Sequence, residues 1–284
     1  MIKTHHVHES RTLTTATDST FQIPIWGTIH NLMLRFATAA GADAAEADMR
    51  SELGNIRVSL GGRDIINASV TRLLDLYEAL GNNVGVPAAV AGTLELNLGR
   101  LLYTDPVARD LFAIGTSGLT PIQITITAGT LANIASAQAF TTRDNRELPL
   151  GAHCKFINFP ISFNATGDHT VDTLPRDLNS AYVMVMAEDG AAGTITFGEV
   201  RRNSVTIQER LPSAINRLKL SNDRFAQPTG YYVYGFTDGK FLDNLPMQGT
   251  TDLRFIQTFS VAPGAAGYNM AALTIVNLPQ QTAA

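Results

Sequence analysis

Apolar and polar residues alternate along much of this chain, which is the pattern of β-strands with one buried face. Ile29, Leu32, Leu34 and Phe36 form the first clear run, and Ile122, Ile124 and Ile126 should all face one side of a later strand. Further strands are predicted, each bounded by turn residues, over 55–60, 92–98, 230–236 and 271–278. Several short strands of this kind in each half indicate β-sandwiches.

One segment, 67–80, has the period of a helix instead. Its apolar residues fall at i, i+3, i+4 and i+7, on Val70, Leu73, Leu74 and Tyr77. Asn67 or Ser69 can cap its N-terminus. Asp75 and Glu78 are expected on the solvated face.

The order of the predicted elements repeats. The landmarks of the first half are Ile23-Pro24, a strand that ends in glycine at 58–61, the helix at 67–80 and a closing segment at 110–114. Those of the second half are Leu174-Pro175, 195–198, a helical segment at 211–218 and 252–256. A repeat this long indicates two similar β domains in tandem, because solenoid repeats are much shorter.

Domain limits follow from the polar stretches. Residues 1–18 are polar and predict an arm that orders only against a partner. The first domain is predicted over 19–142 and the second over 143–284, because 141–145 looks like a polar linker.

Composition narrows the class of function. Only 16% of the 284 residues are charged, below the roughly 25% typical of soluble domains, which suggests a surface covered by partners. The net charge of −4 gives no basic footprint, so no direct binding of nucleic acid is expected. No signal peptide or spanning segment is recognised, which predicts synthesis and assembly in the host cytoplasm.

Two clusters have metal-ligating side chains. His5, His6, His8 and Glu9 lie in the polar arm, where a solvated tail is favoured over a metal site. Asp43, Glu46 and Asp48 share one loop and could bind calcium, although solvated carboxylates are favoured there and for Asp168, Asp172 and Asp238.

The remaining motifs favour structural roles. Ser117 lacks the glycine spacing of a nucleophile elbow, and Gly61-Gly62 predicts a turn. Cys154 adjoins His153, but neighbours on a strand point to opposite faces, so a buried thiol is favoured. Core or subunit contact is favoured over sugar binding for an aromatic set of Trp26, Tyr231, Tyr232 and Tyr234. No catalytic, cofactor-binding or obligatory metal residue is predicted, and no enzyme activity.

Four short segments carry a family resemblance through their order and spacing over residues 20–278. They are Ile23-Pro24 with its strand, 55–63 with its downstream helix, 112–120 and Leu174-Pro175-Arg176. The chain resembles the double jelly-roll major capsid proteins of membrane-containing icosahedral viruses, of the corticovirus and tectivirus lineage.

The resemblance implies an all-β fold of two tandem eight-stranded jelly-roll sandwiches, each with a short helix. It also implies a homotrimer with a pseudo-hexagonal footprint that tiles a bacteriophage shell over an internal membrane. The partners would be neighbouring capsomers and minor capsid or membrane proteins of the virion. Two alternatives stay open: a jelly-roll carbohydrate-binding spike or receptor-binding protein, and a cupin-type enzyme, against which the histidine distribution argues.

Overall fold

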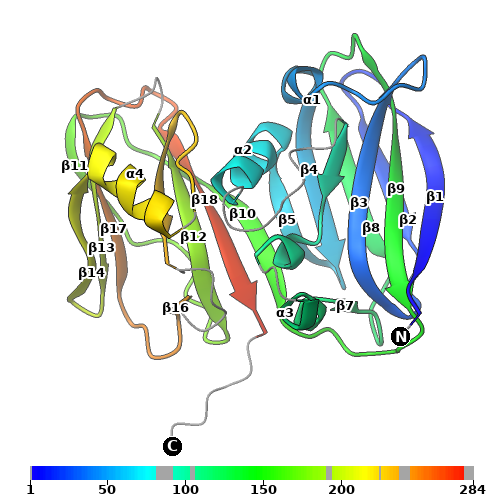
Figure 1. Cartoon of the computed structure of the whole chain (residues 1–284). Helices are drawn as coiled ribbons and strands as arrows, with labels where there is room; N and C mark the ends of the chain where they lie inside the picture. The colour runs from blue at the N-terminus through cyan, green and yellow to red at the C-terminus, as the bar shows by residue number, and fades with distance from the viewer. Residues whose placement is uncertain are drawn as a thin grey trace, which may run out of the picture. The chain divides into compact units, whose positions relative to one another are not determined.

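The computed structural model describes residues 2–80, 92–102, 106–189, 194–223, 225–236 and 244–277. The chain divides into two compact units (Figure 1). Unit 1 comprises Met1–Tyr77 and Val84–Ile157, and unit 2 comprises Glu78–Asn83 and Asn158–Ala284. Each unit is described by itself below.

Unit 1 is built from two sheets. The strands of the first are β1 (Thr4–Thr12), β3 (Thr28–Thr38), β6 (Thr93–Glu95), β7 (Ile114–Gly115) and β9 (Ile134–Asp144). Their order is β1-β9-β3-β6, with β7 paired to β3. The strands of the second are β2 (Asp18–Ile23), β4 (Leu53–Leu60), β5 (Arg63–Ser69) and β8 (Ile122–Ala128). Their order is β2-β8-β4-β5.

Unit 2 has two sheets of the same kind. One contains β10 (His153–Ile161), β12 (Ser180–Glu188), β15 (Tyr231–Gly235), β16 (Leu245–Pro246) and β18 (Tyr268–Val276). The order is β15-β12-β18-β10, with β16 paired to β12. The other contains β11 (Gly167–Val171), β13 (Ile195–Arg202), β14 (Val205–Pro212) and β17 (Leu253–Phe259), in the order β11-β17-β13-β14.

The two units repeat one topology. The two-residue strands β7 and β16 are set aside here. The other eight described strands of unit 1 then occupy the same positions in its two sheets as the other eight described strands of unit 2 do in theirs. This arrangement of two four-stranded sheets is the jelly roll. The prediction of an all-β chain with two tandem jelly rolls is confirmed.

Five short helical segments accompany the strands in the part of the chain that the structure describes. They are α1 (Glu46–Glu52), α2 (Val70–Leu80), the 3-10 helix η1 (Leu98–Leu101), α3 (Pro106–Leu111) and α4 (Ser213–Asn222). Helix α2 follows β5 and helix α4 follows β14, which is the same place in each roll.

Helix α2 largely matches the predicted helix. Leu73, Leu74 and Tyr77 are buried, and the Ser69 hydroxyl accepts a hydrogen bond from the backbone N–H of Arg72 at 3.3 Å. The helix begins at Val70 because the preceding three residues extend β5. The solvated position predicted for Asp75 is wrong: this side chain is buried against Arg50, whose Nη1 donates to Asp75 Oδ1 at 2.6 Å.

The prediction of a polar arm over 1–18 is also wrong. Strand β1 pairs antiparallel with β9 from Thr4 to Thr12, and β2 begins at Asp18. An edge strand of a sheet can carry polar residues on its exposed face. Here several of its polar side chains also hydrogen-bond to β9, so the strand needs few apolar residues of its own.

The predicted linker over 141–145 is in fact the end of β9, where Arg143 and Asp144 are buried. A boundary at 142/143 would cut this strand, whereas the two units meet in sequence at Ile157 and Asn158. Polar residues persist inside the protein here because their charges are paired and hydrogen-bonded within unit 1.

Two details of the proposed repeat are corrected as well. Gly198 lies within β13 and does not end it. Residues 110–114 span the end of α3 and the start of β7, whereas the topological counterpart of β17 is β8. The similar sequences at 110–114 and 252–256 therefore belong to elements that do not correspond.

Candidate functional site

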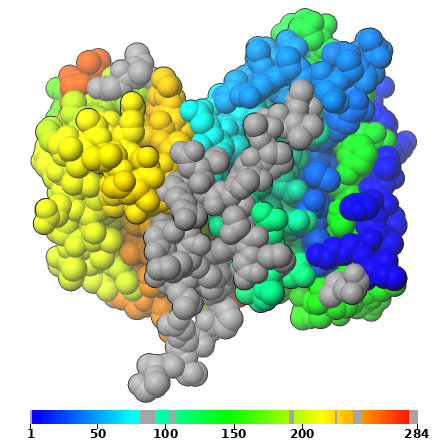
Figure 2. Space-filling view, in the orientation of Figure 1, coloured from blue at the N-terminus to red at the C-terminus, as the bar shows by residue number. Residues whose placement is uncertain are grey.

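Exposed apolar side chains of unit 2 gather on two elements that contact each other, β14 and α4. Val205 and Ile207 are 62% and 44% exposed on β14, and Ile215 and Leu218 are 51% and 61% exposed on α4. Figure 2 shows the outer surface of α4 in yellow. Exposed apolar side chains on adjoining elements can mark a contact with another protein. We call these four residues the β14–α4 face.

Strand β14 also ends its sheet. In the strand order, β13 lies on one side of β14, and the described residues place no strand on the other. Such an edge has unpaired backbone N–H and C=O groups, which can pair with a strand of another chain. The hairpin before it turns at Asn203 and Ser204, both with positive φ, and Asn203 Oδ1 accepts backbone hydrogen bonds from Thr251 and Asp252.

Strand β1 is an open edge of unit 1, in the other of the two kinds of sheet. It pairs with β9 on one side only within the described part of the chain. Val7 is 66% exposed although it is apolar. A shallow groove beside it is lined by His8, Glu9 and Arg11 of β1 and by residues 20–23 of β2.

The histidines of β1 hold the strand in place, each through a different contact. His5 Nδ1 lies 3.0 Å from Thr142 Oγ1, and His8 Nε2 lies 2.9 Å from Thr141 Oγ1. The ring of His6 packs edge-on against Trp26, with ring centres 4.7 Å apart. Among the residues that the structure describes, no three metal-ligating side chains form a group that could hold an ion.

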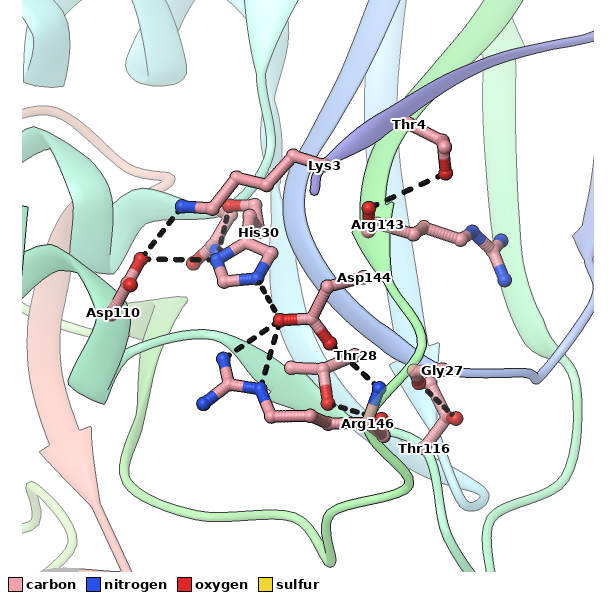
Figure 3. Close-up of polar contacts among 11 residues, drawn as sticks. Lys3, Thr4, Gly27, Thr28, His30, Asp110, Thr116, Arg143, Asp144 and Arg146 are labelled. Carbon is pink, nitrogen blue, oxygen red and sulfur yellow. Dashed lines mark hydrogen bonds and ion pairs between the residues drawn. The ribbon is translucent and has the colours of Figure 1, made fainter. Parts of the chain in front are cut away.

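A chain of ion pairs fastens the start of β1 to the interior of unit 1 (Figure 3). Lys3 Nζ lies 2.9 Å from Asp110 Oδ1, and His30 Nδ1 lies 3.1 Å from the same oxygen. The other ring nitrogen, His30 Nε2, lies 2.8 Å from Asp144 Oδ2. Arg146 completes the chain with its Nη2 atom 2.7 Å from Asp144 Oδ2.

The carboxyl groups of this chain are held in their charged form. Burial alone would raise the pKa of Asp144, but hydrogen bonds from Arg146 and His30 outweigh it and lower this pKa well below its usual range. The pKa of Asp110 is lowered too, because the contacts with Lys3 and His30 outweigh its burial. Lys3, Asp110, His30, Asp144 and Arg146 thus form a fixed ion network that positions the β1 edge.

Arg143 lies on the same strand as Asp144 and is also buried. Its Nη1 donates to the carbonyl oxygens of Pro24 at 2.7 Å and Trp26 at 3.1 Å, and its guanidinium carbon lies 4.9 Å from the centre of the Trp26 ring. Burial lowers the pKa of Arg143 to about 10. Trp26 is 40% exposed, so it is not a core residue, and its ring contacts Arg143 and His6.

The acidic loop considered for calcium has its carboxylates in separate contacts. Asp43 accepts from Arg35 Nε at 2.6 Å, Glu46 from Arg50 Nε at 2.8 Å and Asp48 from Asn133 Nδ2 at 2.9 Å.

The other acidic candidates do not form a group with them. Asp168 pairs with both terminal nitrogens of Arg210, at 2.9 and 2.8 Å, and Asp172 is exposed. Asp238 lies outside the described residues.

The other sequence candidates take structural positions. Ser117 lies in a loop, and its backbone N–H donates to Leu148 O at 3.0 Å. Gly61 and Gly62 form the β4–β5 hairpin turn with positive φ, as predicted. Cys154 is buried, which raises the pKa of its thiol, and burial lowers the pKa of His153.

Tyr231, Tyr232 and Tyr234 are all buried, so the prediction that they belong to a core is confirmed. Tyr234 packs edge-on against Phe255 with ring centres 5.2 Å apart, and Tyr232 donates to Leu211 O at 2.9 Å. They offer no exposed platform for a sugar.

Comparison with known proteins finds one matching family model and several similar structures. Residues 154–274 match the family model of the viral coat protein P2 C-terminal domain. No curated protein matches the sequence. No helix in the described residues is long and apolar enough to cross a membrane.

Solved structures agree over the whole chain. The major capsid protein P2 of bacteriophage PM2 is similar with a TM-score of 0.81 at 16% identity, over 99% of this chain and 99% of that chain. The STIV MCP has a TM-score of 0.67 at 14% identity, over 98% and 97% of the two chains. PBCV-1 VP54 has a TM-score of 0.61 at 10% identity, over 100% and 98%. The chain therefore has the double jelly-roll fold of major capsid proteins, and the resemblance drawn from sequence is confirmed.

The strand edges at β1 and β14 were not singled out from sequence. A signal existed for β14, because Val205 and Ile207 alternate with polar residues just after the Asn203-Ser204 turn. Their exposure could not be deduced, since alternation alone does not say which face of a strand is buried.

Proposed function

We propose that this chain is a major capsid protein that assembles as a homotrimer and tiles an icosahedral viral shell. The observation that carries the proposal is the complete double jelly roll, shared over 99% of both chains with the capsid protein of phage PM2. The coat-protein family model over residues 154–274 supports the same class.

The trimer is favoured by the duplication itself. Three chains with two similar rolls each supply six similar building blocks, and head-to-tail contacts between such blocks close into a ring when the rotation fits. The β14–α4 face and the open β1 edge are surfaces that such contacts would bury.

The proposed partners are neighbouring capsomers and minor capsid or membrane proteins of a virion, over an internal membrane. Assembly would take place in the host cytoplasm, without direct contact with nucleic acid, in keeping with a net charge of −4. We propose a structural role without catalysis or an obligatory cofactor, calcium included. The carbohydrate-binding alternative lacks support in the tyrosines that suggested it, because they are buried.

Electron microscopy of native particles tests this function. Particles should show a regular shell in which this chain is the most abundant protein, built from capsomers with six-fold-like outlines. A chain found only in spikes at vertices, or free of any particle, would contradict the proposal.

A further inference from the structure

The two hairpins β4–β5 and β13–β14 match from the turn to the first register shift, and β13–β14 has one more shift, between Gly198 and Val200. Both turn over two residues with positive φ, Gly61-Gly62 and Asn203-Ser204. Val58 pairs with Ile66 in the first, and Val200 pairs with Gln208 in the second. Both hairpins have a register shift just after that valine. Ile66 of β5 therefore corresponds to Gln208 of β14, and Glu209 follows Gln208 at the second shift.

Strand β5 has a partner on its outer side. Phe156 and Ile157, at the start of β10, pair in parallel with Ile66 and Asn67. These four residues belong to unit 1. Phe156 is fully buried there.

The residues at the same places along β1 as Phe156 and Ile157 along β10 are Val7 and His8. Strands β1 and β10 have nine residues each and take the same place in their sheets, and Phe156 and Val7 are the fourth residue of each. Yet Phe156 is buried and Val7 is 66% exposed. Strand β5 pairs with β10. Within the described residues, their counterparts β14 and β1 each have an open edge instead.

We propose that β14 of one chain pairs in parallel with β1 of a second copy, with Gln208 opposite Val7 and Glu209 opposite His8. The contact repeats the β5–β10 pairing between chains. It rests on the proposed capsomer function and names the surfaces that build it.

The chemistry of the two edges fits this partner. Each offers a row of unpaired backbone groups to the other, which is how an added strand gains affinity. Val7 and Ile207 are exposed apolar side chains on the two edges that would meet, and Ile207 lies next to the paired position on β14. The carboxylate of Glu209 would meet an edge that carries Arg11, whose Nη2 lies 3.0 Å from Glu9 Oε2 in the single chain, and the two carboxylates can share this cation.

Because the two edges differ, the contact is head-to-tail. Each chain gives β14 to one neighbour and β1 to the other, so three chains close into a ring without free edges. A two-fold dimer, with β14 of each chain on β1 of the other, would also leave no free edge, so the number of chains that become linked distinguishes the dimer from the ring.

Cysteine cross-linking of the full-length protein tests the register. In the double variant His8→Cys with Glu209→Cys, oxidation should link chains into a three-chain species on a non-reducing gel. Each single variant should stay unlinked, because Cys154 is buried. The register control is His8→Cys with Val205→Cys, where the thiol lies four residues along the strand, about 13 Å away, and should link far less.

Charge insertion gives a second readout by light scattering. Val7→Asp and Ile207→Asp should each weaken the trimer by about tenfold or more, because a charge would be buried without a partner. Leu178→Asp is the matched control, since Leu178 is equally exposed but lies outside both edges. Its trimer should persist.

The outcomes separate the two proposals. Suppose that the wild type is a trimer. If the double cysteine variant gives no linked chains, if the Val205 control links equally well, or if both aspartate variants remain trimers, the strand pairing is wrong and the capsid function still stands. Links that stop at two chains would refute the ring. A wild-type protein that stays monomeric at every concentration would contradict the capsomer and the pairing together.

Discussion

Three carboxyl groups of unit 1 differ in pKa because their surroundings differ. Glu52 accepts backbone hydrogen bonds from residues 132–134, which outweigh its burial and lower its pKa. Asp144 is held charged by Arg146 and His30. Glu95 Oε1 accepts from the backbone N–H groups of Leu32 and Asn97, but burial outweighs them and raises the pKa of Glu95 to about 7. The first two fix loops and strands as anions, and the third favours a proton.

Glu95 should make the stability of the protein depend on pH. Its pKa is raised on folding, so its stabilising contribution is complete below about pH 4.5 and is lost as the pH rises through about 7. Glu95→Gln keeps the accepting oxygen and cannot ionise. This variant should therefore melt a few degrees above the wild type at about pH 8 and close to it at about pH 5.

Thermal melts across this range check the prediction, with Glu9→Gln on the exposed face of β1 as the control. Parallel pH profiles for wild type and Glu95→Gln would show that Glu95 is ionised in the folded protein throughout.

Helix α2 has a buried side chain at Leu74 and an exposed one at Glu78, so substitutions there should differ in cost. Leu74→Ala should cost about 2 to 5 kcal/mol, because Leu74 is buried and leaves a cavity. Glu78→Ala, on the exposed side, should cost about 0.5 kcal/mol or less. Asp75→Ala should lie between them, at about 1 to 3 kcal/mol, because it removes one of the two carboxylates that Arg50 contacts. Denaturant unfolding measures all three, and equal effects at Leu74 and Glu78 would contradict the observed packing.

These residues also show what sequence could predict. The apolar stripe of α2 follows from a helical period within one segment. The burial of Asp75 does not, because its partner Arg50 lies 25 residues earlier in the sequence and only the fold brings them together.

At the scale of elements, β1 has the largest difference from expectation. It is polar, yet it pairs along β9, and Lys3 and His5 anchor it to Asp110 and Thr142. Strand β9 was likewise misread as a linker at its end, where Arg143 and Asp144 are buried. Polar strands are hard to recognise from sequence, because their stability comes from partners distant in the chain.

Removing β1 should therefore destabilise unit 1. Deletion of residues 2–12 removes its ladder with β9 and its ion pair to Asp110, and should lower the melting temperature by more than about 10 °C. Glu9→Ala, which removes only an exposed ion pair with Arg11, should change it little. A deletion variant that melts like the wild type would mean that β1 is dispensable for the fold.

At the scale of the whole molecule, the chain is one jelly roll built twice. The all-β class, the tandem repeat and the helix after each fifth strand could be predicted, because period and turn residues are local signals. The limits of the units could not, because β9 and β10 lie where the polar sequence suggested a break. The duplication leaves matching edges open on β1 and β14, and assembly of identical chains is the simplest way to cover them.

The mass of the native protein in solution tests this account most directly. Light scattering at micromolar concentration should give about three times the chain mass of 30.5 kDa, and the value should stay constant on moderate dilution. A stable species of 30.5 kDa under mild, low-salt conditions would contradict the trimeric capsomer.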